Sequence, residues 1–502
     1  MNYYNQKLKN TVVATRLKSI GLLVLVAIFS LSNITIAQNK RNKESVLVIK
    51  DGNRDRSKLR ISAKIGGLHN FNIEHRGDIE VTDDDRDIKS ISRGGYLEIT
   101  KTTFGSKRSI LIEASGGQLI REYREGRRLV DYEPDGRKWL AEILPDIVRS
   151  SGIAAESRIN RLYKQGGAKA VMDEIGRLDG SYVQAIYAKK LLNKSGLSKS
   201  DLILIAKGLP DEIDSDYYLA QALKDNSDKF LNDEKTAQAY FDAVGEIGSD
   251  YYAAAVLKTS LEDYTPSAQS ITKIMDASRN IGSDYYQAAV LSSVLEVQEL
   301  EGDVLAEIIS SSKDISSDYY QSQILSKAIG SKNLSTESFE KLMEAVSDVS
   351  SDYYMANVFT KLLDNDLDDQ VQEKMIILVD DKMSSDYYAA SVYKKLIENQ
   401  DIGESSASRL AFALEDMGSA NYASTVIKEA AGRRDLSKGV LKILIKAASE
   451  INSDYYKASA LEALARRVNE KNDADLKEAY RNAAKNINSD TYYGKAMRAL
   501  DR

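Results

Sequence analysis

The stretch "IGSDYYAAAVL", residues 247–257, contains a four-residue motif that recurs along the chain. The motif Ser-Asp-Tyr-Tyr starts at Ser215, Ser249, Ser283, Ser317, Ser351, Ser385 and Ser453. The first six copies are 34 residues apart, and the seventh follows after 68 residues, with a degenerate copy, "SANY" at 419–422, midway. A fixed period of this length is typical of repeat proteins. With degenerate copies at 180–183 and 489–492, the pattern predicts about ten units over residues 165–502.

Each unit is predicted to be a hairpin of two helices. With the Ser of the motif as position 0, position −2 is apolar, +5 is small and +8 is usually apolar, as in Ile247, Ala254 and Leu257. Such spacing indicates a helix that begins at the Ser, a favoured N-cap whose hydroxyl accepts a backbone hydrogen bond. Asp at +1 suits the positive end of the helix dipole. A second helical stretch follows, as at 267–280, so we expect an all-α solenoid that resembles TPR and HEAT arrays, although the TPR consensus is absent.

The two tyrosines of the motif have two interpretations. On a helical wheel, positions +2 and +3 fall at opposite edges of the buried arc, so both rings are expected to pack at the rim of the core. We favour this structural role, because aromatic residues at helical spacing belong to the core more often than to a binding site. The alternative is a ladder of exposed +2 rings that binds peptides or glycans. Its members would be Tyr217, Tyr251, Tyr285, Tyr319, Tyr353, Tyr387 and Tyr455.

Residues 38–135 are predicted to form a small antiparallel β-module. Stretches such as "FNIEH" (71–75), "RSILIEA" (108–114) and "QLIREYRE" (118–125) alternate apolar and polar residues between glycine-bearing turns. This pattern is typical of a sheet with one covered face. The length allows six to eight strands, and both a sandwich and a meander remain open. Helices are expected to connect the module to the solenoid over 136–164, with Trp139, the only tryptophan, as a packing anchor between the two modules.

Two charged motifs in the β-module invite functional interpretations. "TDDDRD" at 82–87 gathers four carboxylates but lacks the alternating spacing of a calcium-binding loop, so we expect a solvated turn. "REYREGRR" at 121–128 is predicted to be a basic hairpin tip. Its partner would be the acidic solenoid, or alternatively an anionic polymer of the cell envelope.

The first 37 residues have the layout of a secretory signal peptide. Lys7, Lys9, Arg16 and Lys18 precede an apolar run at 20–31, and a small-residue patch ends at Ala37. We expect cleavage after Ala37 and export to the periplasm or beyond; the alternative is an uncleaved leader that anchors the chain in the inner membrane. The chain has no cysteine, so packing alone must stabilise it.

Composition and motifs argue against several classes of function. Residues 38–140 carry 22 basic and 17 acidic side chains, and because the whole chain has a net charge of −6 and the leader four basic groups, residues 141–502 carry −15. An acidic chain of this kind is a poor nucleic-acid binder. No H-E-x-x-H, G-x-S-x-G or phosphate-binding glycine loop occurs. We therefore predict no enzyme activity, no cofactor and no metal or catalytic site.

Parts of the sequence resemble a group of bacterial envelope proteins. The resemblance lies in "GDIEVTDDDRDIKSISRGGYLEI" (77–99), "DGRKWLAEILPDIVR" (135–149) and the SDYY array, and it covers most of the chain after the leader. In some of these proteins the same region is joined to a membrane-embedded zinc metallopeptidase of the beta-lactam-sensor type. That half has no counterpart in these 502 residues, so the resemblance implies extracytoplasmic sensing or interaction and does not imply proteolysis. The leader is similar to those of exported Bacteroidota proteins, which implies a Gram-negative periplasm.

The sequence therefore predicts a non-enzymatic protein–protein interaction scaffold outside the cytoplasm, with a role in envelope sensing or signalling. The expected partner is an envelope protein or peptide, with no nucleic acid and no membrane contact beyond the leader. Two alternatives belong to other classes. One is a protein that binds glycans or cell-wall fragments through the tyrosine face, and the other is a hydrolase with an unrecognised carboxylate pair. Exposed and aligned rings would favour the first of these alternatives, and facing acids in a deep cleft the second.

Overall fold

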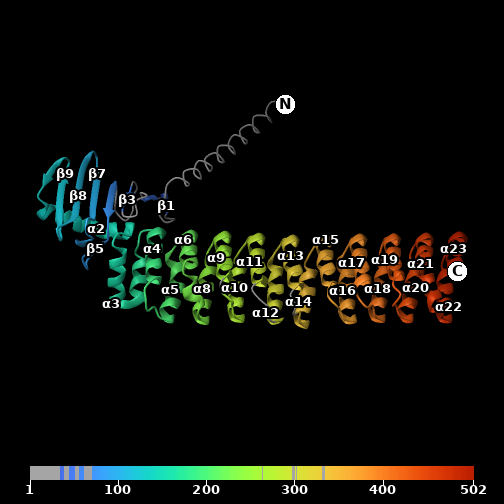
Figure 1. Cartoon of the computed structure of the whole chain (residues 1–502). Helices are drawn as coiled ribbons and strands as arrows, with labels where there is room; N and C mark the ends of the chain where they lie inside the picture. The colour runs from blue at the N-terminus through green and yellow to red at the C-terminus, as the bar shows by residue number, and fades with distance from the viewer. Residues whose placement is uncertain are drawn as a thin grey trace, which may run out of the picture. The chain divides into compact units, whose positions relative to one another are not determined.

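A computed structural model describes residues 70–262, 264–296, 300, 302–330 and 334–501, and the backbone of three strands between residues 34 and 61 (Figure 1). The chain packs as two compact units, residues 1–260 and 261–502, which we call unit 1 and unit 2. Residues 1–33 of the predicted leader lie outside the described residues, while its last four residues belong to the first strand. Within the described part of the chain, no helix is both long and apolar enough to cross a bilayer.

The β-module forms an antiparallel sheet. Its strands are β1 (Ile34–Gln38), β2 (Ser45–Lys50), β3 (Arg56–Ile61), β4 (Phe71–Arg76), β5 (Ile79–Val81), β6 (Ile88–Ile91), β7 (Tyr96–Thr103), β8 (Ser106–Ser115), β9 (Gln118–Glu125) and β10 (Arg128–Val130). Eight strands pair in the order β1-β2-β3-β4-β7-β8-β9-β10, and β5 and β6 form a separate hairpin. The sequence left a sandwich and a meander open, and the strand order of the eight-stranded sheet is that of a meander. The described strands exceed the expected six to eight because β1 and β2 extend the sheet toward the N-terminus.

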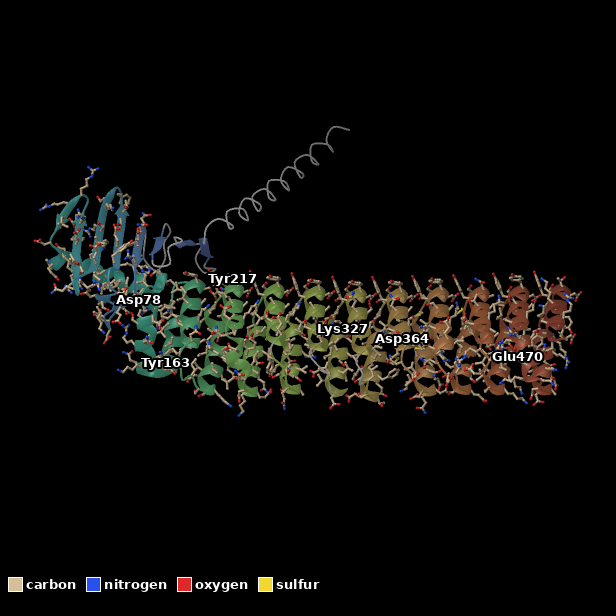
Figure 2. The ribbon with its side chains drawn as sticks, in the orientation of Figure 1. Asp78, Tyr163, Tyr217, Lys327, Asp364 and Glu470 are labelled. Atoms are coloured by element: carbon tan, nitrogen blue, oxygen red, sulfur yellow. The ribbon has the colours of Figure 1, made fainter. Side chains whose placement is uncertain are left out.

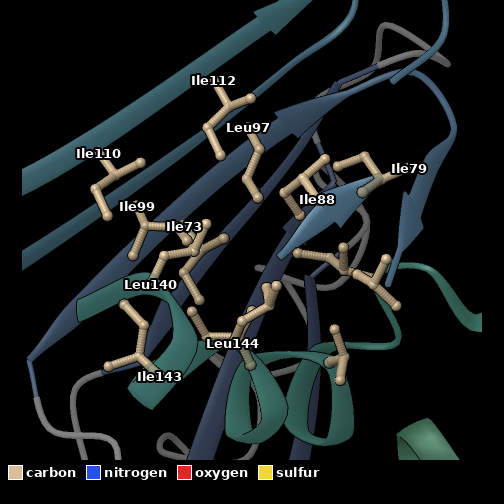
Figure 3. Close-up of a cluster of buried hydrophobic side chains, with 14 of the residues drawn as sticks. Ile73, Ile79, Ile88, Leu97, Ile99, Ile110, Ile112, Leu140, Ile143 and Leu144 are labelled. Carbon is tan, nitrogen blue, oxygen red and sulfur yellow. The ribbon is translucent and has the colours of Figure 1, made fainter. Parts of the chain in front are cut away.

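One face of the sheet is covered by helix α2 (Arg137–Ser151), which follows the short turn η1 (Tyr132–Gly136). Ile73, Ile99 and Ile110 point from the sheet toward Leu140 and Leu144 of the helix, and all five side chains are fully buried (Figure 3). The alternation of the strands and the three-to-four spacing of the helix produce this shared core. The ring of Trp139 lies 6.0 Å from that of Tyr123 in β9. Trp139 therefore anchors α2 to the sheet, whereas the sequence predicted an anchor between the β-module and the solenoid.

The acidic motif at 82–87 is a turn that is solvated only in part: Asp83 and Asp84 are exposed as predicted, but the prediction is wrong for Asp85 and Asp87. Asp85 is only 9% exposed, and its carboxylate accepts hydrogen bonds from Arg158 at 2.8 Å and Arg161 at 2.7 Å. Asp87 pairs with Arg137 at 2.5 Å and Arg121 at 3.4 Å. The arginines lie far from the motif in sequence, so local spacing could not reveal them. Among the described residues no cluster of three or more ligating side chains could hold a metal ion.

Arg158 lies at the centre of a buried ionic cluster that ties the β5–β6 hairpin to helices α3 (Ala155–Ile175) and α4 (Ser181–Leu192). Its side chain is 1% exposed. Besides Asp85, the guanidinium donates to Glu174 of α3 at 2.6 Å and to the hydroxyl of Tyr187 of α4. Burial of an arginine costs free energy unless its charge is paired, and here carboxylates from two distant segments supply that pairing. Sequence analysis missed this cluster entirely.

The basic hairpin tip at 121–128 makes its ion pairs inside the β-module. Arg121 also donates to the carbonyl of Ile88 at 3.0 Å, and Arg124 pairs with Glu122 at 2.9 Å. These contacts differ from the expected contact with the acidic solenoid, because acceptors on β6 and β9 lie closer to the two arginines.

The rest of the chain is an α-solenoid of helical hairpins (Figure 1). The A-helices, which start at the motif, are α4, α6 (Asp216–Lys224), α9 (Asp250–Glu262), α11 (Asp284–Glu296), α13 (Asp318–Ile329), α15 (Asp352–Leu362), α17 (Asp386–Asn399), α19 (Ala420–Gly432), α21 (Asp454–Lys471) and α23 (Asp490–Leu500). The B-helices are α5 (Lys199–Glu212), α8 (Glu234–Gly245), α10 (Ala268–Arg279), α12 (Gly302–Ser311), α14 (Thr336–Ser347), α16 (Asp369–Lys382), α18 (Glu404–Asp416), α20 (Lys438–Glu450) and α22 (Ala474–Ala484). The short segments α7 (Ser227–Leu231) and η2 (Ser312–Asp314) interrupt this alternation.

Each helix packs mainly on the equivalent helix of the next repeat. In unit 1, α4 packs on α6 and α5 on α8, and in unit 2 the same relation holds for α13 with α15 and α12 with α14. The residues at −2, +5 and +8, such as Ile315, Ser322 and Leu325, are buried between the two layers. Each repeat thus completes its core only against its neighbours, which confirms the predicted solenoid.

Candidate functional site

The motif places its Ser at the start of each A-helix, as predicted. Ser215, Ser317 and Ser351 occupy N-cap positions with extended backbone, and the helices begin at the following Asp. The carbonyl of each N-cap accepts the first helical hydrogen bond, as from Leu219 to Ser215 at 2.9 Å. Each complete copy of the motif therefore puts one Asp and two Tyr side chains in the first turn of its A-helix.

The Ser hydroxyl does not cap the helix, contrary to our prediction. Among the described A-helices, the N-cap hydroxyls that make no capping bond are those of Ser215, Ser317, Ser351, Ser385, Ser453 and Ser489. Their ψ angles are between 109° and 121°. The serines that do cap B-helices, such as Ser267 and Ser335, have ψ near 165°. Ser419, in the degenerate copy, is an exception: its ψ is 102°, and its hydroxyl accepts the N–H of Tyr422 at 3.5 Å.

The Asp of the motif joins neighbouring repeats. In unit 1 the N–H of Gly248 donates to Asp216 at 3.0 Å. In unit 2 the corresponding bonds are Ser316 to Asp284 (3.2 Å), Ser350 and Ser351 to Asp318 (3.1 and 2.8 Å), Ser385 to Asp352 (2.7 Å) and Ser489 to Asp454 (2.9 Å). Each carboxylate therefore accepts main-chain N–H groups from the loop that starts the next A-helix. Sequence analysis assigned Asp only to the dipole of its own helix.

Two degenerate copies show how this bridge depends on the residue at +1. In the first repeat, Ser181 stands where the complete copies have Asp, and its hydroxyl accepts the N–H of Ser215 at 3.2 Å. Ala420 replaces Asp in the 419–422 copy, and a methyl group accepts nothing. The N–H of Ser453 turns instead to the carbonyl of Ile451, at 2.8 Å. The junction between α19 and α21 therefore lacks the link that joins α21 to α23.

Replacing Ala420 by Asp is expected to stabilise unit 2. The new carboxylate would accept the N–H of Ser453 and would lie at the positive end of α19, and each effect contributes about 0.5–1 kcal/mol. Thermal unfolding followed by circular dichroism should show a higher midpoint than in the wild type. Ala420→Leu is the matched control, because it offers no acceptor. An A420D midpoint at or below that of the control would contradict the bridging role of Asp at this position.

The +2 tyrosines are exposed at the edge where the A-helices begin, as Figure 2 shows for Tyr217. The exposed fraction of these seven side chains lies between 45% and 56%: Tyr217, Tyr251, Tyr285, Tyr319, Tyr353, Tyr387 and Tyr455. The +3 rings are more buried, and Tyr218 is only 8% exposed. Burial, together with the neighbouring Tyr182 and Tyr217, raises the pKa of Tyr218 to about 12. Its hydroxyl is therefore neutral and able to donate a hydrogen bond at physiological pH.

The rings touch each other in an edge-to-face chain, which we call the tyrosine ladder. In unit 2 the ring of Tyr285 lies 5.0 Å from Tyr286 and 6.0 Å from Tyr320 of the next repeat, and Tyr320 lies 4.9 Å from Tyr319. The same pair of contacts recurs from repeat to repeat as far as Tyr422. Unit 1 contains a shorter ladder from Tyr182 through Tyr218, Tyr217 and Tyr252 to Tyr251. All the sequence-predicted site residues thus belong to ladders.

The unit 2 ladder is interrupted in one place. Asn421 stands at the +2 position, where the complete copies of the motif have Tyr, so Tyr422 has no ring at +2 of its own repeat beside it. The ladder resumes with Tyr455, whose ring lies 4.9 Å from Tyr456 and 5.7 Å from Tyr492. The interruption coincides with the missing Asp at 420.

The ladder edge carries mainly negative charge. The bridging aspartates stand at +1, beside the rings, and acids also occupy position −3 at the ends of the B-helices: Glu212, Glu246, Asp314, Asp348, Asp416 and Glu450. The side chains of Asp314 and Asp348 are 51% and 47% exposed. Lys382 takes the −3 position in one repeat. Exposed phenols flanked by carboxylates favour a partner with apolar and positively charged groups.

Unit 1 also contains two pockets. Tyr182 and Tyr218 line one of about 240 Å³ between α4 and α6. The other, of about 350 Å³, is lined by His75 and the start of α3. Burial lowers the pKa of His75, so this side chain is neutral at pH 7. The second histidine, His69, lies outside the described residues.

No known protein family matches the sequence, and no curated protein matches it. A solved structure from the computational design of self-assembling cyclic protein homooligomers aligns at 16% identity over 61% of this chain and 94% of its own, with a TM-score of 0.12. A circular tandem repeat protein with novel repeat topology and enhanced subunit contact surfaces aligns at 10% identity over 74% and 90% of the two chains, with a TM-score of 0.17. With such TM-scores, neither likeness adds to the description of this chain.

Proposed function

We propose that this protein is a non-enzymatic interaction scaffold of the cell envelope, and that the tyrosine ladder is the surface on which it holds a partner protein. One observation carries the proposal: +2 rings exposed by about half recur in successive repeats, and each contacts the more buried +3 ring of the next repeat. The core is already filled by the residues at −2, +5 and +8, so folding alone does not require an exposed row of phenols. A repeat fold that displays one extended surface suggests a scaffold or interaction role.

The location outside the cytoplasm is part of the proposal. The leader-like sequence, the absence of cysteine and the resemblance to bacterial envelope proteins support it. The same resemblance supports a role in sensing or signalling, in which the solenoid would hold a partner that reports on the state of the envelope.

Binding of glycans or cell-wall fragments is the second candidate, and the alignment of the exposed rings favours it. The angles between neighbouring rings favour a polypeptide partner instead. Adjacent rings in unit 2 are inclined at 63° to 67° from Tyr285 to Tyr422, apart from one pair at 71°. Such rings present edges and faces in alternation, which suits side chains better than the flat face of a sugar chain.

The test compares the full chain with a variant that replaces Tyr285, Tyr319 and Tyr353 by Ala, in affinity capture from an envelope extract. We expect the wild type to retain a protein partner that the variant loses, while circular dichroism shows that the variant keeps its helices. Phe412→Ala is the matched control, since Phe412 is an aromatic side chain exposed by 49% on B-helix α18. Equal capture by the wild type and the triple variant would refute the ladder as the binding surface. Ladder-dependent retention on purified cell-wall fragments would support the second candidate.

A further inference from the structure

We propose that the unit 2 ladder binds a positively charged polyproline II segment of the partner, with one turn of that segment on each repeat. This inference deepens the proposed function and rests on it. It commits to the conformation and charge of the partner segment, neither of which follows from the presence of a repeat surface alone.

The spacing of the rings is the first reason. Tyr320 lies 6.0 Å from Tyr285 and 4.9 Å from Tyr319, so equivalent rings of successive repeats can be no farther apart than these two distances combined. Helices that pack side by side are about 8–10 Å apart. A polyproline II helix has three residues per turn and rises about 3.1 Å per residue, so one turn advances about 9 Å. Every third residue of such a segment can therefore meet an equivalent ring, whereas the two-residue period of a β-strand, about 6.6 Å, cannot.

The chemistry of the rings is the second reason. A polyproline II segment makes no internal hydrogen bonds, so its carbonyl groups are available to donors. The phenol hydroxyls of the ladder are donors, and the ring surfaces suit proline side chains. Grooves lined with aromatic residues are a recurring means of holding such segments, because a preformed helix loses little entropy on binding. The continuous ladder from Tyr285 to Tyr422 provides this surface over consecutive repeats.

The charge of the edge is the third reason. Asp284, Asp318 and Asp352 each accept neutral backbone N–H groups, so their negative charges are not cancelled by those bonds. Asp314 and Asp348 add exposed carboxylates three residues before the next N-cap. Arg279 and Lys313 partly neutralise the charges of these two carboxylates, through ion pairs of 3.4 Å to Asp314 and 3.2 Å to Asp348. Lysine or arginine at every third position of the partner would meet this acidic edge and could also lie over the phenol rings.

The experiment measures binding of fluorescent peptides to the full chain by anisotropy. The probe is (Pro-Pro-Lys)₄, whose twelve residues cover about four repeats at three residues each. The comparison peptides are (Gly-Ser-Lys)₄, which has the same charge without the conformation, and (Pro-Pro-Glu)₄, which reverses the charge. We expect (Pro-Pro-Lys)₄ to bind at least tenfold more tightly than either comparison peptide. Its binding should weaken as added salt screens the carboxylates. Equal binding of (Gly-Ser-Lys)₄ would overturn the conformational part of the proposal, and equal binding of (Pro-Pro-Glu)₄ its charge part.

Two variants localise the binding. The double variant Y319A/Y353A is expected to lower the affinity for (Pro-Pro-Lys)₄ about tenfold, while Phe412→Ala should leave that affinity unchanged. Asn421→Tyr would close the interruption in the ladder, and we expect about threefold tighter binding of the longer (Pro-Pro-Lys)₇ with no change for (Pro-Pro-Lys)₄.

Undiminished binding by Y319A/Y353A would overturn the proposal. If envelope capture depends on the ladder but (Pro-Pro-Lys)₄ does not bind, the inference fails and the proposed function stands. If envelope capture does not depend on the ladder and (Pro-Pro-Lys)₄ does not bind, the inference and the proposed function both fail.

Discussion

Replacing Arg158 by methionine is expected to lower the free energy of unfolding of unit 1 by about 3–5 kcal/mol. The substitution leaves Glu174 buried without its 2.6 Å partner and removes two of the hydrogen bonds to Asp85. Removing one partner of a buried ion pair is costly because the remaining charge is less well neutralised and does not regain water. Glu174 keeps Arg149 at 3.0 Å and Asp85 keeps Arg161 at 2.7 Å, so we expect the lower end of this range. Urea unfolding monitored by the fluorescence of Trp139, the only tryptophan, reports on this part of the chain.

Two further variants separate buried charge from lost packing. Arg177→Met removes an arginine that is 69% exposed and 4.0 Å from the same Glu174, so its effect should be small. R158M combined with Glu174→Met removes the stranded carboxylate and should recover part of the loss. If R158M unfolds at the same urea concentration as R177M, the cluster does not hold the β5–β6 hairpin to the helices.

Replacing Asp284, Asp318 and Asp352 together by Ala is expected to destabilise unit 2 by about 3–6 kcal/mol. Each aspartate accepts a backbone N–H of the next repeat, and a hydrogen bond to a charged group contributes about 1–2 kcal/mol at a partly exposed site. Because repeats are stabilised by their interfaces, the loss should also broaden the unfolding transition as neighbouring repeats uncouple. Thermal and urea unfolding by circular dichroism measure both effects.

The matched control replaces Asp314, Asp348 and Asp416, the acids at position −3, by Ala. It removes the same charge from the same edge, but Asp314 and Asp348 make exposed ion pairs that contribute little. Equal destabilisation by the two triple variants would mean that the edge responds to total charge and that the individual bridges are unimportant.

The sequence was sufficient to predict the solenoid because its period is local. The 34-residue register, the apolar residue at −2 and the small residue at +5 are visible in every unit, and the helix starts follow from them. The antiparallel sheet followed from alternation in the same way, and β9 has the predicted bounds of 118–125. The meander order did not, because pairing between β4 and β7 skips a hairpin that the strand pattern alone does not set apart.

What the sequence could not supply are contacts across repeats and across the chain. The role of Asp318 depends on backbone N–H groups 32 and 33 residues away, and the burial of Asp85 depends on Arg158 and Arg161. Likewise, the wheel placed Tyr285 and Tyr286 at opposite edges of the buried arc and gave no indication that Tyr285 would touch Tyr320. The role of the Ser hydroxyl was predicted wrongly for most copies because it depends on local backbone geometry, which the residue type does not determine.

The aspartate bridge has a consequence for how such a chain can change in length. The acceptor on one repeat recognises main-chain N–H groups, which every repeat presents whatever its side chains are. Duplication or loss of a whole 34-residue segment would therefore bring together an acceptor and a donor that already fit, with no compensating substitutions at the new junction. Copy number can then vary more freely than in an array whose neighbours are matched through side-chain shape, and each added copy would lengthen the aromatic edge by one step.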